Sequence, residues 1–185
     1  MGLLSDKNSA ITTSATPNPS SDRKMSFGNV LQTWRQLEKI PFGKNAFSLF
    51  FSVQAPYFMT IRPSVHELKP GYAKVSLNQR WGVQNHIKTV HAIAVCNLVE
   101  MAMGLVTEST IPKHLRWLPK GMDVNYLKKA TGTLTATTDI NPETFFILEK
   151  YPGEVKVPVS VKDASGVEVT SAEVRLWISL KPEKK

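Results

Sequence analysis

Apolar residues recur along the first part of the chain at the spacing of a surface helix. Between residues 27 and 40 they stand three and four positions apart, which places them on one buried stripe. Ser26 is a suitable N-cap residue and Pro41 cannot continue a helix, so these two residues give its expected limits. The next apolar run, residues 44–53, fits either a short helix or a strand.

A pair of strands and a long apolar helix are expected next. Residues 57–68, interrupted at Pro63, and residues 73–77 have the pattern of strands. Residues 69–72, Lys-Pro-Gly-Tyr, join them as a turn, because proline presets φ at the second position and glycine accepts a positive φ at the third. Residues 89–107 are apolar on almost every side, which predicts a helix buried in the core.

A period of two follows this helix. After a loop expected at residues 112–119, apolar and polar side chains alternate and Thr and Val are frequent, as is typical of strands. The alternating segments are residues 122–126, 134–138, 155–161 and 167–180. Two strands, one long helix and three or four further antiparallel strands predict an α+β domain whose sheet wraps around the helix.

The chain length fits one domain with flanking tails. Of its 185 residues 42% are apolar, which suffices for one core but not for two full domains. Residues 7–22 are rich in Ser, Thr, Asn and Pro and lack the apolar stretch of a secretory signal and the arginine run of a transit peptide. We therefore expect a disordered tail over residues 1–25, a domain over residues 26–180 and a basic tail over residues 181–185.

The central apolar run is about as long as the shortest membrane span, but it contains His91, Asn97 and Glu100. We therefore expect a buried helix and no membrane span.

Cys96 is the single cysteine, which excludes an internal disulfide and any metal site built from several cysteines. We expect no metal or other cofactor, and a reducing, cytoplasmic setting. No basic residue adjoins Cys96 in the sequence, so core packing is a better interpretation of it than a nucleophile.

The net charge of +8 allows three classes of partner: nucleic acid, an anionic membrane or a phosphorylated small molecule. The densest basic run includes Arg116, Lys120, Lys128 and Lys129. No stripe of closely spaced arginine and aromatic residues accompanies it, so we expect no nucleic acid as a partner. A solvated basic face and a phosphate-binding rim remain as alternatives.

Glu100 is the most informative residue, because every neighbour in the run from residue 98 to residue 103 is apolar. An ionised carboxylate needs partners when it is buried, so Glu100 is either a structural partner of a loop, Lys or Arg, or a base or nucleophile in a cleft. His91, in the first turn, is either a cap or core residue or part of that site. The two lie nine residues apart, roughly 13–14 Å along a helix, and cannot form a dyad within one chain.

The polar residues before and within the central helix resemble the active-site segment of hotdog-fold thioesterases of the PaaI-like type. These carry an Asn, six residues later a His-Gly-Gly at the start of the central helix, and nine residues after the His an Asp or Glu. Asn85, His91 and Glu100 keep both spacings. The Lys-Pro-Gly turn and the strand after the helix are also similar, so the resemblance covers about residues 45–180.

The resemblance implies a hotdog fold and a homodimer or homotetramer in which each active site uses two chains. It implies that Glu100 of one chain acts as base or nucleophile on an acyl-CoA or other acyl thioester, while the helix start of the other chain, near Ala92, holds the carbonyl. Asn85 would orient the carbonyl or the water, and His91 would shape the loop. The residues that would contact the phosphates of the thiol carrier are Arg116, Lys120, Lys128 and Lys129.

Three positions depart from the family pattern. Ala92 and Ile93 replace the two glycines, and Lys88 stands where the family often has glycine. If the substrate carbonyl needs a missing side chain at the helix start, the Ala92 methyl narrows the slot and changes the acyl preference or the rate. A non-catalytic acyl-CoA-binding domain with a structural Glu100 is therefore the alternative to hydrolysis, and a nucleic-acid or membrane-surface binder is the third hypothesis.

Overall fold

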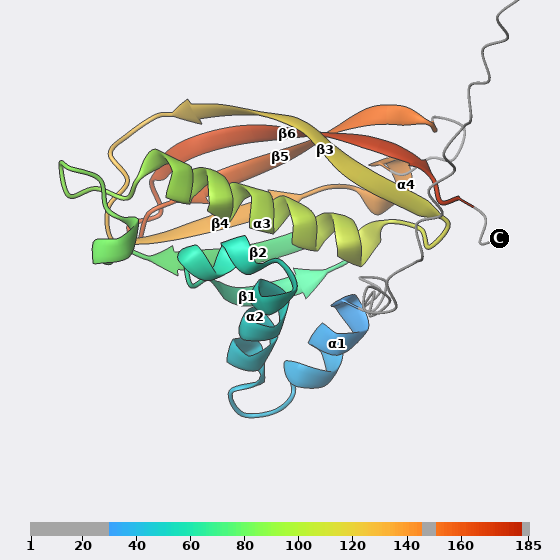
Figure 1. Cartoon of the computed structure of the whole chain (residues 1–185), viewed down its shortest axis with the longest axis horizontal. Coiled ribbons are helices and arrows are strands. Elements are labelled where there is room, and N and C mark those ends of the chain that lie inside the picture. Colours follow the sequence, from blue (N-terminus) through green and yellow to red (C-terminus); the bar gives the residue numbers. More distant parts are fainter. Residues whose placement is uncertain (1–29, 146–150, 183–185) are drawn as a thin grey trace, which may run out of the picture.

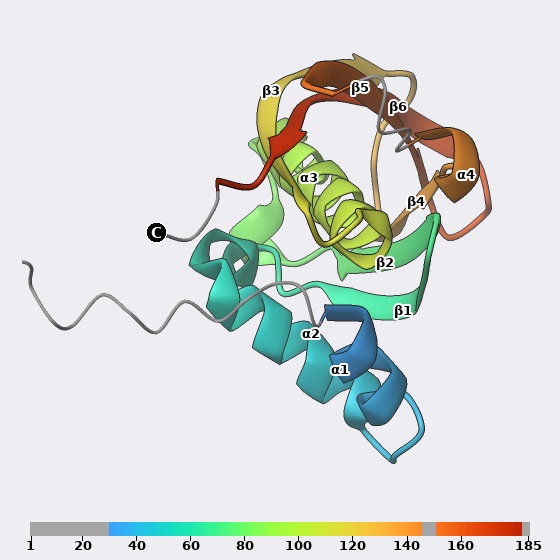
Figure 2. The same cartoon turned by 90° about the vertical axis from the view of Figure 1, so that its right-hand side faces the viewer.

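The computed structural model describes residues 30–145 and 151–182, and it contains a six-stranded antiparallel sheet curved around one long helix, α3 (Ala92–Thr110) (Figures 1 and 2). The order across the sheet is β1-β2-β4-β5-β6-β3. The predicted α+β architecture is therefore confirmed. The strands are β1 (Ser64–Lys69), β2 (Tyr72–Asn78), β3 (Leu115–Tyr126), β4 (Thr133–Asp139), β5 (Gly153–Lys162) and β6 (Glu168–Leu180).

Several predictions at the chain ends lie outside the described residues. The expected tail over residues 1–25 and the helix start at Ser26 are among them, and so is the basic tail beyond Pro182. The helix predicted from this region is seen from Val30 onward, as α1 (Val30–Leu37).

The central helix is buried on most sides, as its composition predicts. Leu98, Val99, Met101 and Val106 are 0% exposed, because the curved sheet covers them. Within the described residues, α3 is the one helix with the length and hydropathy of a membrane span, and most of it is buried in the core. It begins three residues later than expected, because His91 has an extended backbone and caps the helix.

The hairpin between β1 and β2 closes as predicted. Gly71 adopts φ 81°, and a Cβ at this position would lie 2.4 Å from the carbonyl oxygen of Ile140. The positive φ and the close carbonyl oxygen both mean that only glycine fits there without a backbone shift.

Two short helices cover the β1 side of the sheet (Figure 2). The ambiguous segment at residues 44–53 is a helix, α2 (Gly43–Gln54), whose inner face is buried. Trp34 of α1 and Phe47 of α2 pack edge to face at 5.0 Å between ring centroids. The hydroxyl of Ser48 accepts a hydrogen bond from the backbone N–H of Val65 at 2.8 Å, which fixes α2 to β1.

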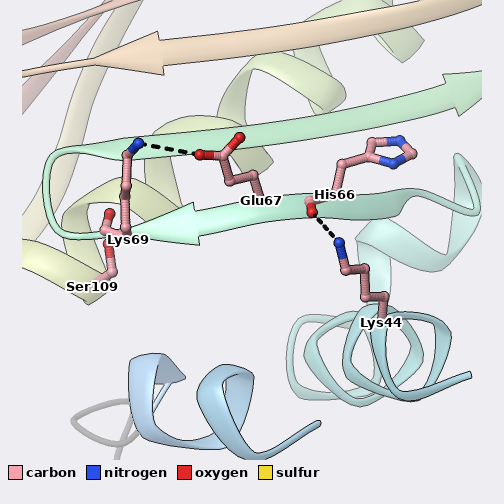
Figure 3. A network of polar contacts seen from close by, with 5 residues as sticks. All are labelled: Lys44, His66, Glu67, Lys69 and Ser109. Carbon is pink, nitrogen blue, oxygen red and sulfur yellow. Dashed lines mark hydrogen bonds and ion pairs between the residues drawn. The ribbon is translucent and has the colours of Figure 1, made fainter. Parts of the chain in front are cut away.

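Polar contacts around β1 add to this packing (Figure 3). Lys44 of α2 donates from Nζ to the carbonyl oxygen of His66 at 2.9 Å, and Lys69 forms an ion pair with Glu67 at 3.2 Å. Ser109 of α3 donates to the carbonyl oxygen of Lys69 at 3.3 Å. These contacts connect α2, β1 and the end of α3.

Two predicted segments are wrong. Residues 57–60, expected in a strand, belong to a 3-10 helix, η2 (Pro56–Thr60), which has proline in its first turn. Residues 115–119, expected in a loop, belong to β3, which pairs with β6 and has a bulge between Pro119 and Gly121. Proline is tolerated there because β3 lies at the edge of the sheet and pairs with β6 alone within the part of the chain that the structure describes.

Candidate active site at the start of the central helix

The start of α3 leaves two backbone donors without an acceptor in the helix. His91 is the N-cap, and its Nδ1 accepts a hydrogen bond from the N–H of Ile93 at 3.1 Å. The N–H of Val95 donates to the carbonyl oxygen of His91 at 3.1 Å. The N–H groups of Ala92 and Ala94 precede the first intrahelical bonds and face the same end of the helix dipole, so they can bind an oxyanion.

The loop before α3 is organised by Asn85. Its Oδ1 accepts from the N–H of Ile87 at 3.1 Å and of Thr89 at 3.0 Å, and its Nδ2 donates to Oγ1 of Thr89 at 2.8 Å. The side-chain amide is thus engaged within the loop. Lys88 adopts φ 60°, the region that glycine favours.

A pocket of about 200 Å³ adjoins the helix start. Its walls come from η2 and the residue after it, from the 3-10 helix η3 (Trp81–Val83) and the residue after it, and from the start of α3. The lining residues are Tyr57, Thr60, Ile61, Gly82, Val83, Gln84, His91, Ile93, Ala94 and Asn97.

Asn97 is a pocket residue whose role the sequence does not predict. It is 4% exposed, and its Nδ2 donates to the carbonyl oxygen of Tyr57 at 3.2 Å and to Oγ1 of Thr60 at 3.0 Å. These bonds hold η2 against α3. Its Oδ1 is buried and has no partner among the described residues, so the pocket wall contains an unused acceptor. The signal in the sequence is a polar residue inside an apolar helix, which by itself argues only against a membrane span.

Glu100 lies on the side of α3 that faces β3. One turn before it, Cys96 Sγ lies 3.1 Å from the hydroxyl oxygen of Tyr126, and one turn after it, Gly104 is next to the ring of Trp117. Glu100 is half-buried and makes no hydrogen bond or ion pair within the described residues. Among residues 30–145 and 151–182 of one chain, this carboxylate therefore has no structural partner.

A second carboxylate on the same helix, Glu108, does have a hydrogen-bond partner. Glu108, two turns after Glu100, accepts a hydrogen bond at Oε1 from Nε1 of Trp117 at 2.6 Å. Burial raises the pKa of Glu108 above its usual range, and the bond from Trp117 opposes this shift only in part. Both carboxylates lie on the side of α3 that faces β3. They differ in that Glu108 has a hydrogen-bond partner and Glu100 has none among the described residues.

A family comparison matches residues 43–178 to the domain of unknown function DUF4442. The chain belongs to this family. Among curated proteins, no sequence matches the chain. Among solved structures, one structural-genomics target with no stated activity is 38% identical to this DUF4442 protein, with a TM-score of 0.70, and the match covers 82% of this chain and 99% of that one.

More distant structures have named activities. A protein of unknown function from Pseudomonas aeruginosa, described as a probable thioesterase, is 18% identical over 70% of this chain and 91% of its own, with a TM-score of 0.65. A mutant of the phenylacetic acid degradation protein PaaI from Thermus thermophilus is 17% identical over 66% and 97%, with a TM-score of 0.54. At these identities the likeness concerns the fold, and it confirms the predicted hotdog fold of the DUF4442 protein.

The basic residues of the DUF4442 protein do not form one cluster within a chain. Arg116 and Lys120 lie in the first half of β3, and Lys128 and Lys129 follow its far end. Twelve residues separate Arg116 from Lys128, which is roughly 40 Å of extended chain. The Lys128–Lys129 pair lies nearer to the start of α3, since the carbonyl of the next residue, Ala130, accepts a bond from Val90 at 2.8 Å.

Cys96 is half-buried under Tyr126, not inside the core. Burial and the contact with Cys96 raise the pKa of the Tyr126 hydroxyl to about 12, so Tyr126 is neutral at physiological pH. Within residues 30–145 and 151–182, no group of three His, Cys, Asp or Glu side chains is arranged to hold a metal ion.

Replacing Glu108 with glutamine is expected to stabilise the protein at neutral pH. Because the folded-state pKa of Glu108 is raised, its ionised form costs stability above that pKa, and this cost disappears below the usual value of 4.5. Glutamine stays neutral and its Oε1 still accepts from Trp117. Thermal melting should show Glu108→Gln a few degrees more stable at pH 7, with the difference shrinking as the pH falls toward 4.5. If Glu108→Gln melts at a lower temperature than the wild type at every pH, the ionised Glu108 carboxylate does not destabilise the protein.

Proposed function

We propose that this protein hydrolyses acyl thioesters of CoA or of a carrier thiol to a free acid and a thiol. The observation that carries the proposal is Glu100, a half-buried carboxylate without a partner among the described residues, on an otherwise apolar helix. Structures with the same fold that are named thioesterases support the same reaction. We further propose that the reaction takes place in the cytoplasm, where the released thiol stays reduced.

The chemistry needs a base, a water and donors for an oxyanion. In the general-base route, Glu100 takes a proton from water, and the water oxygen attacks the thioester carbonyl carbon. The carbonyl oxygen becomes an oxyanion, which the N–H of Ala92 stabilises. When the intermediate collapses, the C–S bond breaks, the acid is released and the thiolate receives the proton from Glu100. In the nucleophile route, a carboxylate oxygen of Glu100 attacks the carbonyl carbon, the C–S bond breaks and the thiolate leaves. Water then hydrolyses the resulting anhydride, which releases the acid, restores the Glu100 carboxylate and supplies the proton that the thiolate takes up.

One active site would combine two copies of the chain. Ala92 and Glu100 are eight residues apart on α3, roughly 12 Å, which is too far for both to act on one carbonyl. The edge of β3 that does not contact β6 is open within the described residues, and Leu118 on this strand is 59% exposed. Antiparallel pairing of two β3 strands would extend the sheet and bring Glu100 of one copy toward the α3 start of the other.

The same pairing would bring the two separated groups of basic residues close together. An antiparallel partner strand runs in the opposite direction, so the partner's Arg116 and Lys120 would approach Lys128 and Lys129 of the first copy. Lys120 also forms an ion pair with Glu154 at 3.2 Å, which reduces its availability. We therefore assign Lys128 and Lys129 the larger share in binding the phosphates of the thiol carrier.

The pocket at the start of α3 would hold part of the acyl group. At about 200 Å³ it is smaller than the pockets that enclose drug-sized ligands. Ile93 reaches into its lining at a position where similar thioesterases have glycine. We therefore expect a preference for short acyl groups, and a panel of short, medium, long and aryl acyl-CoAs with detection of free thiol tests it.

Replacing Lys128 and Lys129 together with alanine is expected to raise KM for acyl-CoA several-fold at low salt, with kcat little changed, because exposed charges act through screened attraction. The effect should shrink as salt is added. A matched double replacement of Lys74 and Lys162, which removes the same charge from β2 and β5, should leave KM unchanged. Equal effects of the two double variants would show that only net charge matters and would remove Lys128 and Lys129 from the site.

A further inference from the structure

The outer face of α2 and its flanking turns expose a row of apolar side chains. Along α2 the exposed residues Ala46, Leu49 and Val53 follow one another at steps of three and four, so they lie on one face. Leu49 is 57% exposed and Val53 59%. The surface, which we name the α2 stripe, consists of Ile40, Phe42, Leu49, Val53, Tyr57 and Met59.

The opposite face of α2 is buried against the rest of the protein. Phe47 is 0% and Phe51 3% exposed, and the hydroxyl of Ser52 donates to the carbonyl oxygen of Ser48 at 2.7 Å. The orientation of the helix is therefore fixed by its contacts with β1, and Figure 2 shows α2 outside the body formed by the sheet and α3. A surface helix normally presents polar side chains outward, so an apolar outer face indicates a further contact.

Basic residues lie before, within and after the α2 stripe in the sequence. Residues 30–63 contain four basic side chains and one acidic side chain, Glu38. Arg35, Lys39 and Arg62 are exposed and form no ion pair within the described residues. The fourth, Lys44, is held by the β1 carbonyl of His66 (Figure 3). The stripe thus combines exposed apolar groups with an excess of positive charge.

We propose that the α2 stripe docks on the surface of an anionic lipid bilayer. A helix with an exposed apolar face and basic flanks lies in the plane of the interface, with its apolar side chains at the acyl boundary and its cations near the lipid phosphates. The excess of positive charge favours this occupant over a second copy of the chain, because two copies would bring like charges together. Tyr57 belongs both to the stripe and to the pocket wall, so docking would place the pocket beside the bilayer.

Vesicle co-sedimentation of the full chain tests this proposal without reference to thioester hydrolysis. The protein should bind vesicles of phosphatidylcholine with phosphatidylglycerol, and bind pure phosphatidylcholine vesicles far less. Leu49→Ser combined with Val53→Ser should lower the partition coefficient at least about tenfold, because both apolar contacts are lost. Leu180→Ser is the matched control, since Leu180 is 58% exposed at the end of β6, and it should bind like the wild type.

A charge variant provides a second, independent readout. Lys39→Glu with Arg62→Glu should reduce binding to anionic vesicles, and added salt should weaken binding of the wild type in the same direction. Thermal melting confirms that each variant is folded. The proposal is overturned if the wild type ignores anionic vesicles or if Leu180→Ser loses as much binding as the stripe variant. If the wild type does not bind vesicles and the stripe variant has a lower mass in solution than the wild type, the stripe is instead a contact between two copies of the chain.

Discussion

Replacing Glu100 with glutamine is expected to abolish thioester hydrolysis, with a loss in kcat of at least about 10²-fold. Glutamine has nearly the same size but cannot accept a proton from water or attack a carbonyl. The carboxylate has no hydrogen bond or ion pair within the described residues, so its loss should leave the fold intact. The measurement is steady-state release of free thiol from the best acyl-CoA of the panel, together with a thermal melt and an acyl-CoA binding isotherm.

The matched control for this variant lies on the same helix. Glu108→Gln makes the same chemical change two turns later, at a carboxylate whose partner is Trp117, and it should hydrolyse the substrate at the wild-type rate. Unchanged turnover in Glu100→Gln would remove Glu100 from the reaction. Retained acyl-CoA binding with no turnover in either the wild type or the variant would favour a binding domain over an enzyme.

Replacing Ala92 with proline is expected to lower kcat/KM by about 10²–10³-fold, the usual cost of losing one oxyanion donor. Proline removes the backbone N–H and is well tolerated at the first position of a helix. The preceding residue, His91, has φ −64° and ψ 138°, a conformation that a following proline accepts. The variant therefore deletes one donor with little change to α3.

Ala92→Ser is the control, because it changes the side chain and keeps the N–H; it should retain most of the activity. Circular dichroism should show the same helix content and a similar melting temperature for both variants. If Ala92→Pro turns over substrate normally, the oxyanion is held elsewhere, and the N–H of Ala94 becomes the next donor to test.

Much of the fold could be predicted from the sequence because two periodicities are clear in it. The apolar run containing Leu98 and Met103 can only be buried, and the alternating valines of β5 can only cover one face of a sheet. The two wrong predictions both lie next to prolines that do not end an element. Pro56 begins a 3-10 helix in front of β1, and Pro119 lies within β3, where an edge strand does not need its N–H.

The candidate site could be predicted only in part. The spacing of Asn85, His91 and Glu100 points to the start of α3 and to a position about two turns further along it, and the roles of these residues stay predictions. The hydrogen bonds of Asn97 to η2 depend on residues 37 and 40 positions away in the chain, so no local pattern contains them. The basic residues looked like one cluster in sequence, but β3 is extended and separates Arg116 from Lys128.

The central claim, that one site combines the α3 start of one copy with Glu100 of another, can be tested by complementation. Glu100→Gln and Ala92→Pro chains, each inactive alone, are co-expressed with different affinity tags and purified through both. Each mixed dimer then contains one site with both functional groups and one with neither, so thiol release should recover to about half of the wild-type rate. A mixed dimer as inactive as its parents would contradict the claim.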